Sequence, residues 1–149
     1  FSDMQCSYCG DALGNLDQLR EDFAGKVRIV VKQMPVHETA KLAAEAALAA
    51  EAQGKFWPLH DLMLSNQEDL SLEALLALGK RAGLDVAALR QDLEQHTYAR
   101  AVQAELATAM ELELTGAPSF VINGKRIMGH RPIAELRTLV NEALADLES

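Results

Sequence analysis

The sequence is poor in cysteine, in aromatic side chains and in positive charge. Its 149 residues include two cysteines, and aromatic residues make up 5% of the chain. The formal net charge of −8 argues against nucleic acid as a partner, because proteins that bind nucleic acids carry basic surfaces. No apolar run is long enough to span a membrane. The remaining composition, 49% hydrophobic and 24% charged, indicates one globular domain, or one domain with an insertion.

Both cysteines belong to one C-x-x-C motif, Cys6-Ser7-Tyr8-Cys9, which lies just before a predicted helix. Apolar residues recur behind it at near-helical spacing: Leu13, Leu16, Leu19 and Phe23. A thiol at a helix N-terminus faces unpartnered backbone N–H groups and the positive end of the helix dipole. Both favour the thiolate, which is the nucleophile. Positions three apart share a helix face at a Cα separation of about 5–5.5 Å, so this pair can form a disulfide without backbone movement.

Three interpretations of the cysteine pair compete. A structural disulfide would close a loop of four residues, which constrains the unfolded chain very little. A structural zinc site needs four ligands. The histidines that could complete one are scattered singly: His37, His60, His96 and His130. The favoured interpretation is therefore a redox-active pair, and neither a metal nor an organic cofactor is expected.

Hydrophobic patterning predicts a strand and then a long helical region. Residues 27–32 are apolar and β-branched at consecutive positions, which is typical of a strand covered on both faces. Residues 38 to about 114 read as helices without a recognisable catalytic motif. Five are expected: residues 38–53, residues 56–64, one capped by Ser71, one capped by Asp85, and residues 98–110.

The pattern changes at residues 115–118, which form a cluster of helix breakers. Ser119–Ile122 is predicted as a strand, Asn123-Gly124 as a type I′ turn and residues 126–128 as the returning strand. A last helix is expected to begin at Pro132, because proline suits the first position of a helix. Its apolar stripe consists of Ile133, Leu136, Val140, Leu144 and Leu147.

This order of elements resembles an α/β thioredoxin-like fold that carries an inserted helical domain. Within that fold, it resembles the DsbA-like thiol–disulfide oxidoreductases. The resemblance is carried by the C-x-x-C motif with Phe1 and Asp3 before it, by residues 32–37, 42–47 and 54–61, and by residues 116–124. It implies a central mixed sheet with flanking helices, built from residues 1–37 and 115–149, with residues 38–114 as the insertion. The usual first strand precedes the motif, so it would lie upstream of residue 1 and is absent from this chain.

The resemblance also implies roles for individual residues. Cys6 corresponds to the exposed nucleophile and Cys9 to the buried resolving cysteine. Pro118 corresponds to the cis-proline that packs against the disulfide, and Ala117 to the residue whose backbone meets the substrate. Ser7 and Tyr8 are expected to contact the substrate as well. The pair Ser7-Tyr8 replaces the Pro-His of the strongest oxidants and Ala117 replaces a threonine or valine, so a less strongly stabilised thiolate is expected.

The function implied is thiol–disulfide exchange, with disulfide formation as the favoured direction. The expected partners are reduced or misoxidised protein substrates and a redox partner that renews the disulfide. The expected location is extracytoplasmic, in a bacterial periplasm or cell envelope, and a cytoplasmic location stays open.

Three alternative functions remain. The same exchange could run in reverse as a reductase or isomerase, or the chain could be a glutathione-using enzyme, against which Cys9 argues. The third alternative is a thioredoxin-like binding or regulatory module of a larger protein.

Overall fold

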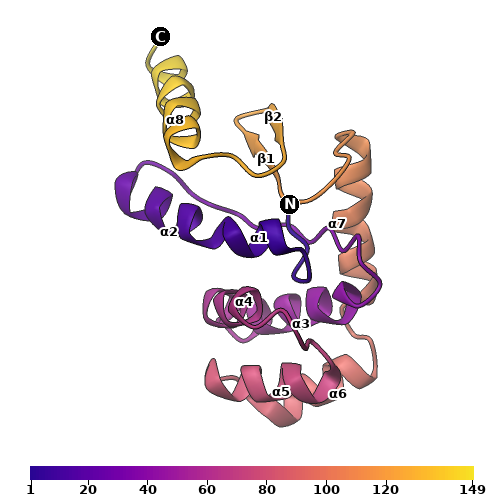
Figure 1. Cartoon of the computed structure of the whole chain (residues 1–149). Coiled ribbons are helices and arrows are strands. Elements are labelled where there is room, and N and C mark those ends of the chain that lie inside the picture. The colour runs from indigo at the N-terminus through magenta and orange to yellow at the C-terminus, as the bar shows by residue number, and fades with distance from the viewer.

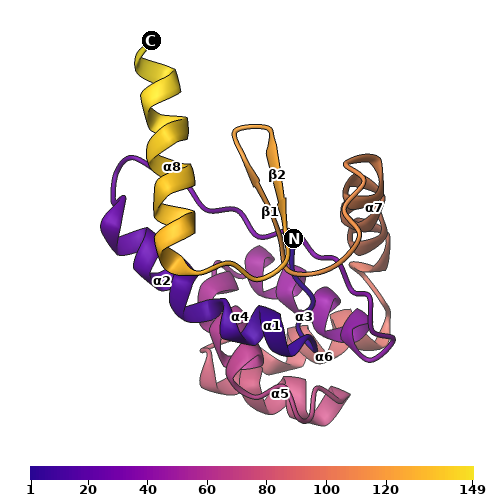
Figure 2. The same ribbon diagram turned by 45° about the horizontal axis from the view of Figure 1, so that its top comes forward.

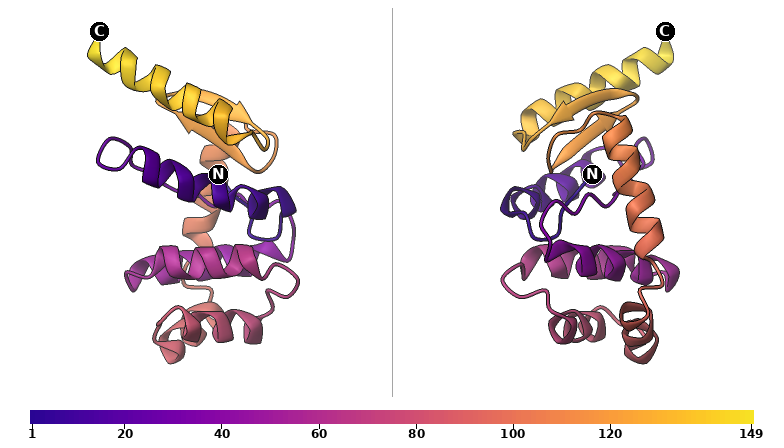
Figure 3. Two further views of the ribbon diagram at one scale, coloured as in Figure 1. Left: turned by 60° about the vertical axis from the view of Figure 1, so that its left-hand side comes forward. Right: turned by 90° about the vertical axis from the view of Figure 1, so that its right-hand side faces the viewer.

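The computed structural model describes residues 1–149 as eight helices and one β-hairpin (Figure 1). The elements in chain order are α1 (Ser7–Asp11), α2 (Leu13–Asp22), α3 (Ala40–Ala52), α4 (Phe56–Ser65), α5 (Leu72–Arg81), α6 (Val86–Glu94), α7 (Ala99–Glu111), β1 (Ser119–Ile122), β2 (Lys125–Met128) and α8 (Ile133–Glu148). Figure 3 shows them in successive layers. The hairpin and α8 form one end, α1 and α2 come next, then α3 with α4, and α5 with α6 form the other end. No helix has both the length and the apolar character needed to cross a bilayer.

The five helices predicted between residues 38 and 114 are all present. Two begin at the predicted caps, where Ser71 accepts a hydrogen bond from the backbone N–H of Ala74 and Asp85 accepts one from that of Ala88. The stop after α3 is also as predicted, because Gly54 has a φ of 71°, which only glycine adopts at no steric cost. The division into a thioredoxin-like domain and a helical insertion stays a prediction.

Helix α3 lies at the centre of the largest hydrophobic core. Nine of its thirteen residues are buried. Most of them are alanines, so the helices around it can approach its backbone closely. The core between α3 and its neighbours also includes large side chains from α4, α5 and α6: Leu59, Met63, Leu75, Leu76 and Leu89. Met4, Cys6 and Cys9 belong to the same cluster, so the motif is packed directly onto these helices.

The hairpin is antiparallel and confirms the prediction closely. Ser119 pairs with Met128 and Ile122 pairs with Lys125, so the second strand begins one residue earlier than expected. The turn residues Asn123 and Gly124 have φ angles of 46° and 88°, as a type I′ turn requires.

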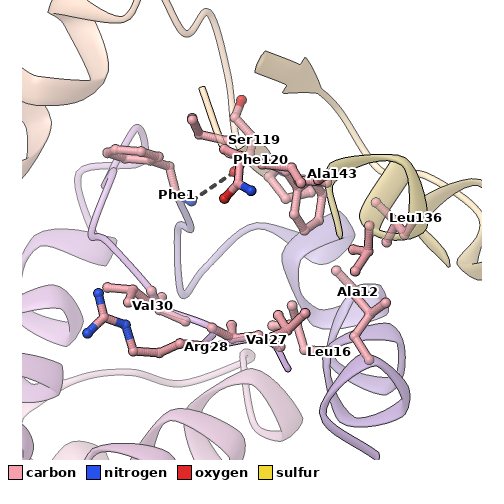
Figure 4. A pocket seen from close by; sticks show the side chains of 18 of the residues that line it. Phe1, Ala12, Leu16, Val27, Arg28, Val30, Ser119, Phe120, Leu136 and Ala143 are labelled. Carbon is pink, nitrogen blue, oxygen red and sulfur yellow. Dashed lines mark hydrogen bonds between the residues drawn. The ribbon is translucent and has the colours of Figure 1, made fainter. Parts of the chain in front are cut away.

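The strand predicted over residues 27–32 is wrong: this segment is extended but forms no strand. One parallel bridge, from Ser2 to Gln33, joins its end to the N-terminal residues. Beyond that bridge the segment has no strand beside it to supply hydrogen bonds. It lies across a cavity of about 410 Å³ from β1, and Val30 is 55% exposed (Figure 4). The predicted central mixed sheet is therefore reduced to a two-stranded hairpin, although the amino-acid pattern of the segment is that of a strand.

This cavity is an apolar groove between the segment of residues 27–31 and the hairpin. Figure 2 shows α2 and α8 on one side of the hairpin. Leu16 of α2 and Leu136 of α8 are among the residues that line the groove, and Phe1 lies at one end of it (Figure 4). We call it the hairpin groove.

Candidate active site

The two cysteines lie at the start of α1 and are free thiols. Cys6 is the N-cap, with an extended backbone (φ −77°, ψ 125°), and Cys9 lies within the helix. The carbonyl of Cys6 accepts the backbone N–H groups of Cys9 at 3.1 Å and of Gly10 at 3.2 Å, which are the first bonds of the helix. The predicted position of Cys6 at a helix N-terminus is confirmed.

The two cysteine residues differ in exposure, but less than expected. Cys9 is 2% exposed and Cys6 is 9% exposed, so the expectation of an exposed nucleophile is wrong in degree. The cause is the loop before β1, because the thiol of Cys6 donates to the carbonyl of Ala117 at 3.5 Å. Cys6 is nevertheless the more accessible of the two.

Burial raises the pKa of Cys9 to about 12, since a thiolate is poorly solvated inside the protein. The backbone N–H of Asp3, 3.4 Å from the sulfur, and the side chain of Ser2 act in the opposite direction. The neighbouring Cys6 raises the pKa further. At neutral pH, Cys9 is therefore a protonated thiol.

The loop that meets Cys6 comes from the far end of the chain. The peptide bond between Ala117 and Pro118 is cis. Ala117 lies 111 positions after Cys6, and the fold brings the two into contact. Pro118 is buried, and it lines the hairpin groove together with Cys9. Of the predicted site residues, the structure thus places Cys6 beside Ala117, and Cys9 and Pro118 among the residues that line the hairpin groove.

The other two predicted site residues point outward. Ser7 and Tyr8 are exposed, and Tyr8 keeps 60% of its surface accessible. Its ring stacks on that of His130, with 6.5 Å between the ring centroids and 26° between the planes. His130 follows Gly129, whose backbone N–H donates to the carbonyl of Pro118 at 2.9 Å. Tyr8, His130 and the loop of Pro118 therefore form one exposed surface beside Cys6.

Sequence reasoning did not find the role of Asp3. Its carboxylate is buried and accepts the backbone N–H groups of Gln5, Val36 and His37 at 2.7, 2.7 and 2.9 Å. It also lies 3.0 Å from the ring of His37. These bonds fix the segment that enters the motif, and the same residue donates to Cys9. Val36 and His37 lie 33 and 34 positions away, so only the folded structure reveals them as partners.

Gln67 is a second residue that the sequence did not single out. It follows α4, and its side chain reaches the backbone of Met4 and Cys6. No group of three or more His, Cys, Asp or Glu side chains is placed to hold a metal ion. The nucleophilic groups of this arrangement are the free thiols of Cys6 and Cys9.

The sequence matches the family described as thioredoxin over residues 1–142. Among curated proteins, it is 36% identical over 148 residues to the Na(+)/H(+) antiporter NhaA 3 of Salinispora tropica, covering 97% of this chain and 22% of that protein. It is 35% identical over 129 residues to the antiporter NhaA of Herminiimonas arsenicoxydans, covering 87% of this chain and 21% of that protein. The chain thus spans about a fifth of the length of these relatives.

Solved structures match nearly the whole chain. A thioredoxin-like oxidoreductase from Silicibacter pomeroyi superposes with a TM-score of 0.85 at 29% identity, covering 95% of this chain and 82% of its own. The thiol-disulfide exchange protein alpha-DsbA2 from Wolbachia pipientis has a TM-score of 0.84 at 23% identity, covering 94% and 77%. BdbD from Bacillus subtilis has a TM-score of 0.82 at 20% identity, covering 97% and 85%.

Proposed function

Because the chain belongs to the thioredoxin superfamily, as a DsbA-like member with a thioredoxin-like fold, we propose that it exchanges disulfides with protein substrates through Cys6 and Cys9. The observation that carries this proposal is the asymmetry of the two thiols. Cys6 caps α1 and lies beside an exposed surface, whereas Cys9 lies behind it with its pKa raised to about 12. One sulfur is placed to meet a substrate and the other to resolve the bond that forms.

In the favoured direction, the protein donates its disulfide. A substrate thiolate attacks the sulfur of Cys6, and the bond between Cys6 and Cys9 breaks. Cys9 leaves and takes up a proton, which its raised pKa favours. A second substrate thiolate then attacks the substrate sulfur of the mixed disulfide and releases Cys6 as a thiolate. The substrate has lost two electrons to the cysteine pair, and a redox partner must remove them to renew the disulfide.

The substrate would lie on the surface made by Ser7, Tyr8 and the loop of Ala117 and Pro118. Tyr8 offers an exposed aromatic face. The loop carries backbone groups beside Cys6, and an extended peptide can pair with such groups as an added strand does. The proposed substrates are reduced or misoxidised proteins, and the proposed location is a bacterial periplasm or cell envelope. The location is supported by the likeness, at 24% identity, to a structure described as a periplasmic thioredoxin-like protein from Salmonella enterica.

The first test is the reduction potential of the Cys6–Cys9 pair, measured by equilibration with glutathione and thiol labelling. A potential well above that of the glutathione couple supports an oxidase, and one well below it supports the reverse reaction. In parallel, Cys9→Ser is expected to accumulate mixed disulfides with reduced, unfolded proteins, because the resolving thiol is missing. Cys6→Ser is the matched control and should trap none. Absence of mixed disulfides in Cys9→Ser would contradict the proposal.

A second function is favoured by the curated relatives. These are named as Na(+)/H(+) antiporters, and the chain covers 21% and 22% of two of them. The chain would then act as a thioredoxin-like binding or regulatory module of a longer protein. A double variant, Cys6→Ser with Cys9→Ser, separates the two functions. A binding module keeps its partner in this variant, whereas an oxidoreductase loses every covalent complex with its substrates.

A further inference from the structure

The loop between α4 and α5 is bonded to the backbone that carries the redox pair. Gln67 lies 61 positions after Cys6, and its side-chain amide donates to the carbonyl of Cys6 at 2.7 Å. The same amide donates to the carbonyl of Met4 at 3.0 Å. In return, the side chain of Gln5 donates to the backbone carbonyl of Gln67 at 2.5 Å. Three hydrogen bonds therefore join this loop to the three residues that lead into α1.

Gly10 leaves room for this amide. A Cβ atom on Gly10 would lie 2.6 Å from Oε1 of Gln67 and 3.3 Å from the carbonyl of Leu64. Both distances are shorter than ordinary van der Waals contact. The side chain of Gln67 is therefore enclosed between α1 and the segment that enters it, and the loop is anchored on both sides of Gln67 by the buried Leu64 and Leu70.

We propose that Gln67 is a positioning residue for the redox pair, which holds the Cys6 peptide unit in the orientation that the exchange reaction needs. The carbonyl of Cys6 already accepts the N–H groups of Cys9 and Gly10, and Gln67 adds a third donor to it. One carbonyl thus connects the backbone of both cysteines with the loop after α4. This inference rests on the proposed function.

Loss of the Gln67 contacts is expected to change the equilibrium between the dithiol and the disulfide, as well as the local structure. The balance between dithiol and disulfide depends on the geometry of both sulfurs and on how well the thiolate is stabilised. Fixing Cys6 as the N-cap holds its thiol beside the carbonyl of Ala117, in the arrangement that the reduced form adopts. When Gln67 is removed, this part of the chain loosens, so the reduced form loses stabilisation and the disulfide form gains.

The test uses Gln67→Ala, Gln67→Glu and Gly10→Ala in the whole chain. Glutamate keeps the size of the side chain but cannot donate, and the methyl group at Gly10 displaces the amide. Equilibration with glutathione is expected to move toward the disulfide on the order of five-fold in each variant, because the bond to Cys6 is the one of the two lost hydrogen bonds that acts on the pair directly. Alkylation of Cys6 should become faster, because the loosened segment no longer holds the thiol against the carbonyl of Ala117. Because both sites act through one amide, combining Gly10→Ala with Gln67→Ala should add little to either alone.

The matched control is Gln53→Ala, because the side chain of Gln53 bonds to the backbone of Asp85, away from the motif. It should leave both readouts unchanged. Wild-type exchange with unchanged equilibrium and alkylation profile in all three variants would overturn the inference and leave the proposed function intact. A wild-type chain that does not exchange disulfides would instead overturn the proposed function. Should Gln67→Ala not fold, the near-isosteric Gln67→Glu decides the outcome.

Discussion

The two cysteines differ in burial, and therefore in the reactivity that we expect of each thiol. Cys9 is 2% exposed, and burial raises its pKa to about 12. Cys6 is 9% exposed and lies at the surface shared with Tyr8 and Ala117. The thiolate is the reactive form of cysteine, so the two thiols should differ in reactivity by far more than their difference in exposure suggests.

We therefore expect iodoacetamide to modify Cys6 alone in the folded, reduced protein at pH 8. A thiol with a pKa of about 12 is ionised in about one molecule in ten thousand at that pH. Mass spectrometry of Cys6→Ser should show Cys9 unmodified until the chain is unfolded in guanidinium chloride. Modification of Cys9 in folded Cys6→Ser at the rate of a free cysteine would contradict the prediction.

The sequence predicts those parts of the site that are built from residues close together in the chain. The C-x-x-C spacing and the helix behind it predict the position of Cys6 correctly, because both patterns lie within residues 6–23. The contacts of Asp3 and Gln67 depend on residues that lie 33 to 63 positions away. No local pattern encodes such contacts. From the sequence alone, a polar side chain is expected at the surface, whereas the fold buries Asp3 and half-buries Gln67.

Among the helices, α4 contains a buried histidine whose burial makes the stability of the protein depend on pH. His60 is 1% exposed and stacks on Phe56, with 5.3 Å between ring centroids. Burial lowers its pKa, although the hydrogen bond to Asp61 at 2.8 Å raises it. Arg20 of α2, which also lowers the pKa, lies over the ring of Trp57 at 4.1 Å. Asp17 acts in the opposite direction.

This burial makes the stability of the protein depend on pH below about 6.5, the ordinary pKa of histidine. There the unfolded chain takes up a proton that folded His60 resists, so the unfolded state binds more protons and stability falls as pH falls. The free energy of unfolding, from urea titrations at pH 7 and pH 5, should decrease less in His60→Gln than in the wild type. An equal decrease in both proteins would contradict the assigned role of His60.

Two glycines in helices should respond in opposite directions to the same substitution. A Cβ on Gly79 of α5 would lie 2.5 Å from a methyl group of the buried Leu89 in α6, whereas one on Gly14 of α2 meets nothing within 4 Å. Gly79→Ala should destabilise the fold by about 1–3 kcal/mol through overpacking. Gly14→Ala should stabilise it by about 0.5–1 kcal/mol, because alanine is the better helix former. Chemical denaturation measures both, and a gain from Gly79→Ala would show that the helices separate without cost.

At the scale of the whole molecule, the hairpin groove explains why one predicted strand is missing. A strand is defined by its neighbours, and residues 27–31 face the groove instead of a partner strand. The first bonds of such a partner are already present. The nitrogen of Phe1 donates to the carbonyl of Ser119 at 2.8 Å, and that of Ser2 donates to the carbonyl of Lys32 at 2.9 Å. An amino-acid pattern predicts the tendency to form a strand, but not whether a neighbour is available.

An extension of five alternating valine and threonine residues before Phe1 should therefore occupy the groove as a strand. It would run antiparallel to β1 and parallel to residues 27–31, and bury apolar surface on both sides. We expect the melting temperature to rise by several degrees relative to a five-residue glycine-serine extension. The backbone amides of residues 28–31 should also become protected from hydrogen exchange. Equal melting temperatures of the two extended proteins would contradict this prediction.

The alanines of α3 limit how far the sequence can change. This helix packs against α4, α5, α6 and α7, and its buried alanines leave no space for a longer side chain. A substitution by a larger residue, which would be harmless on the outer face of α8, must here displace several helices together. In a library of random variants, folding would fail most often at these small residues, although none of them takes part in chemistry. The helix that we expect to tolerate the fewest substitutions is thus α3, which contributes no cysteine to the site.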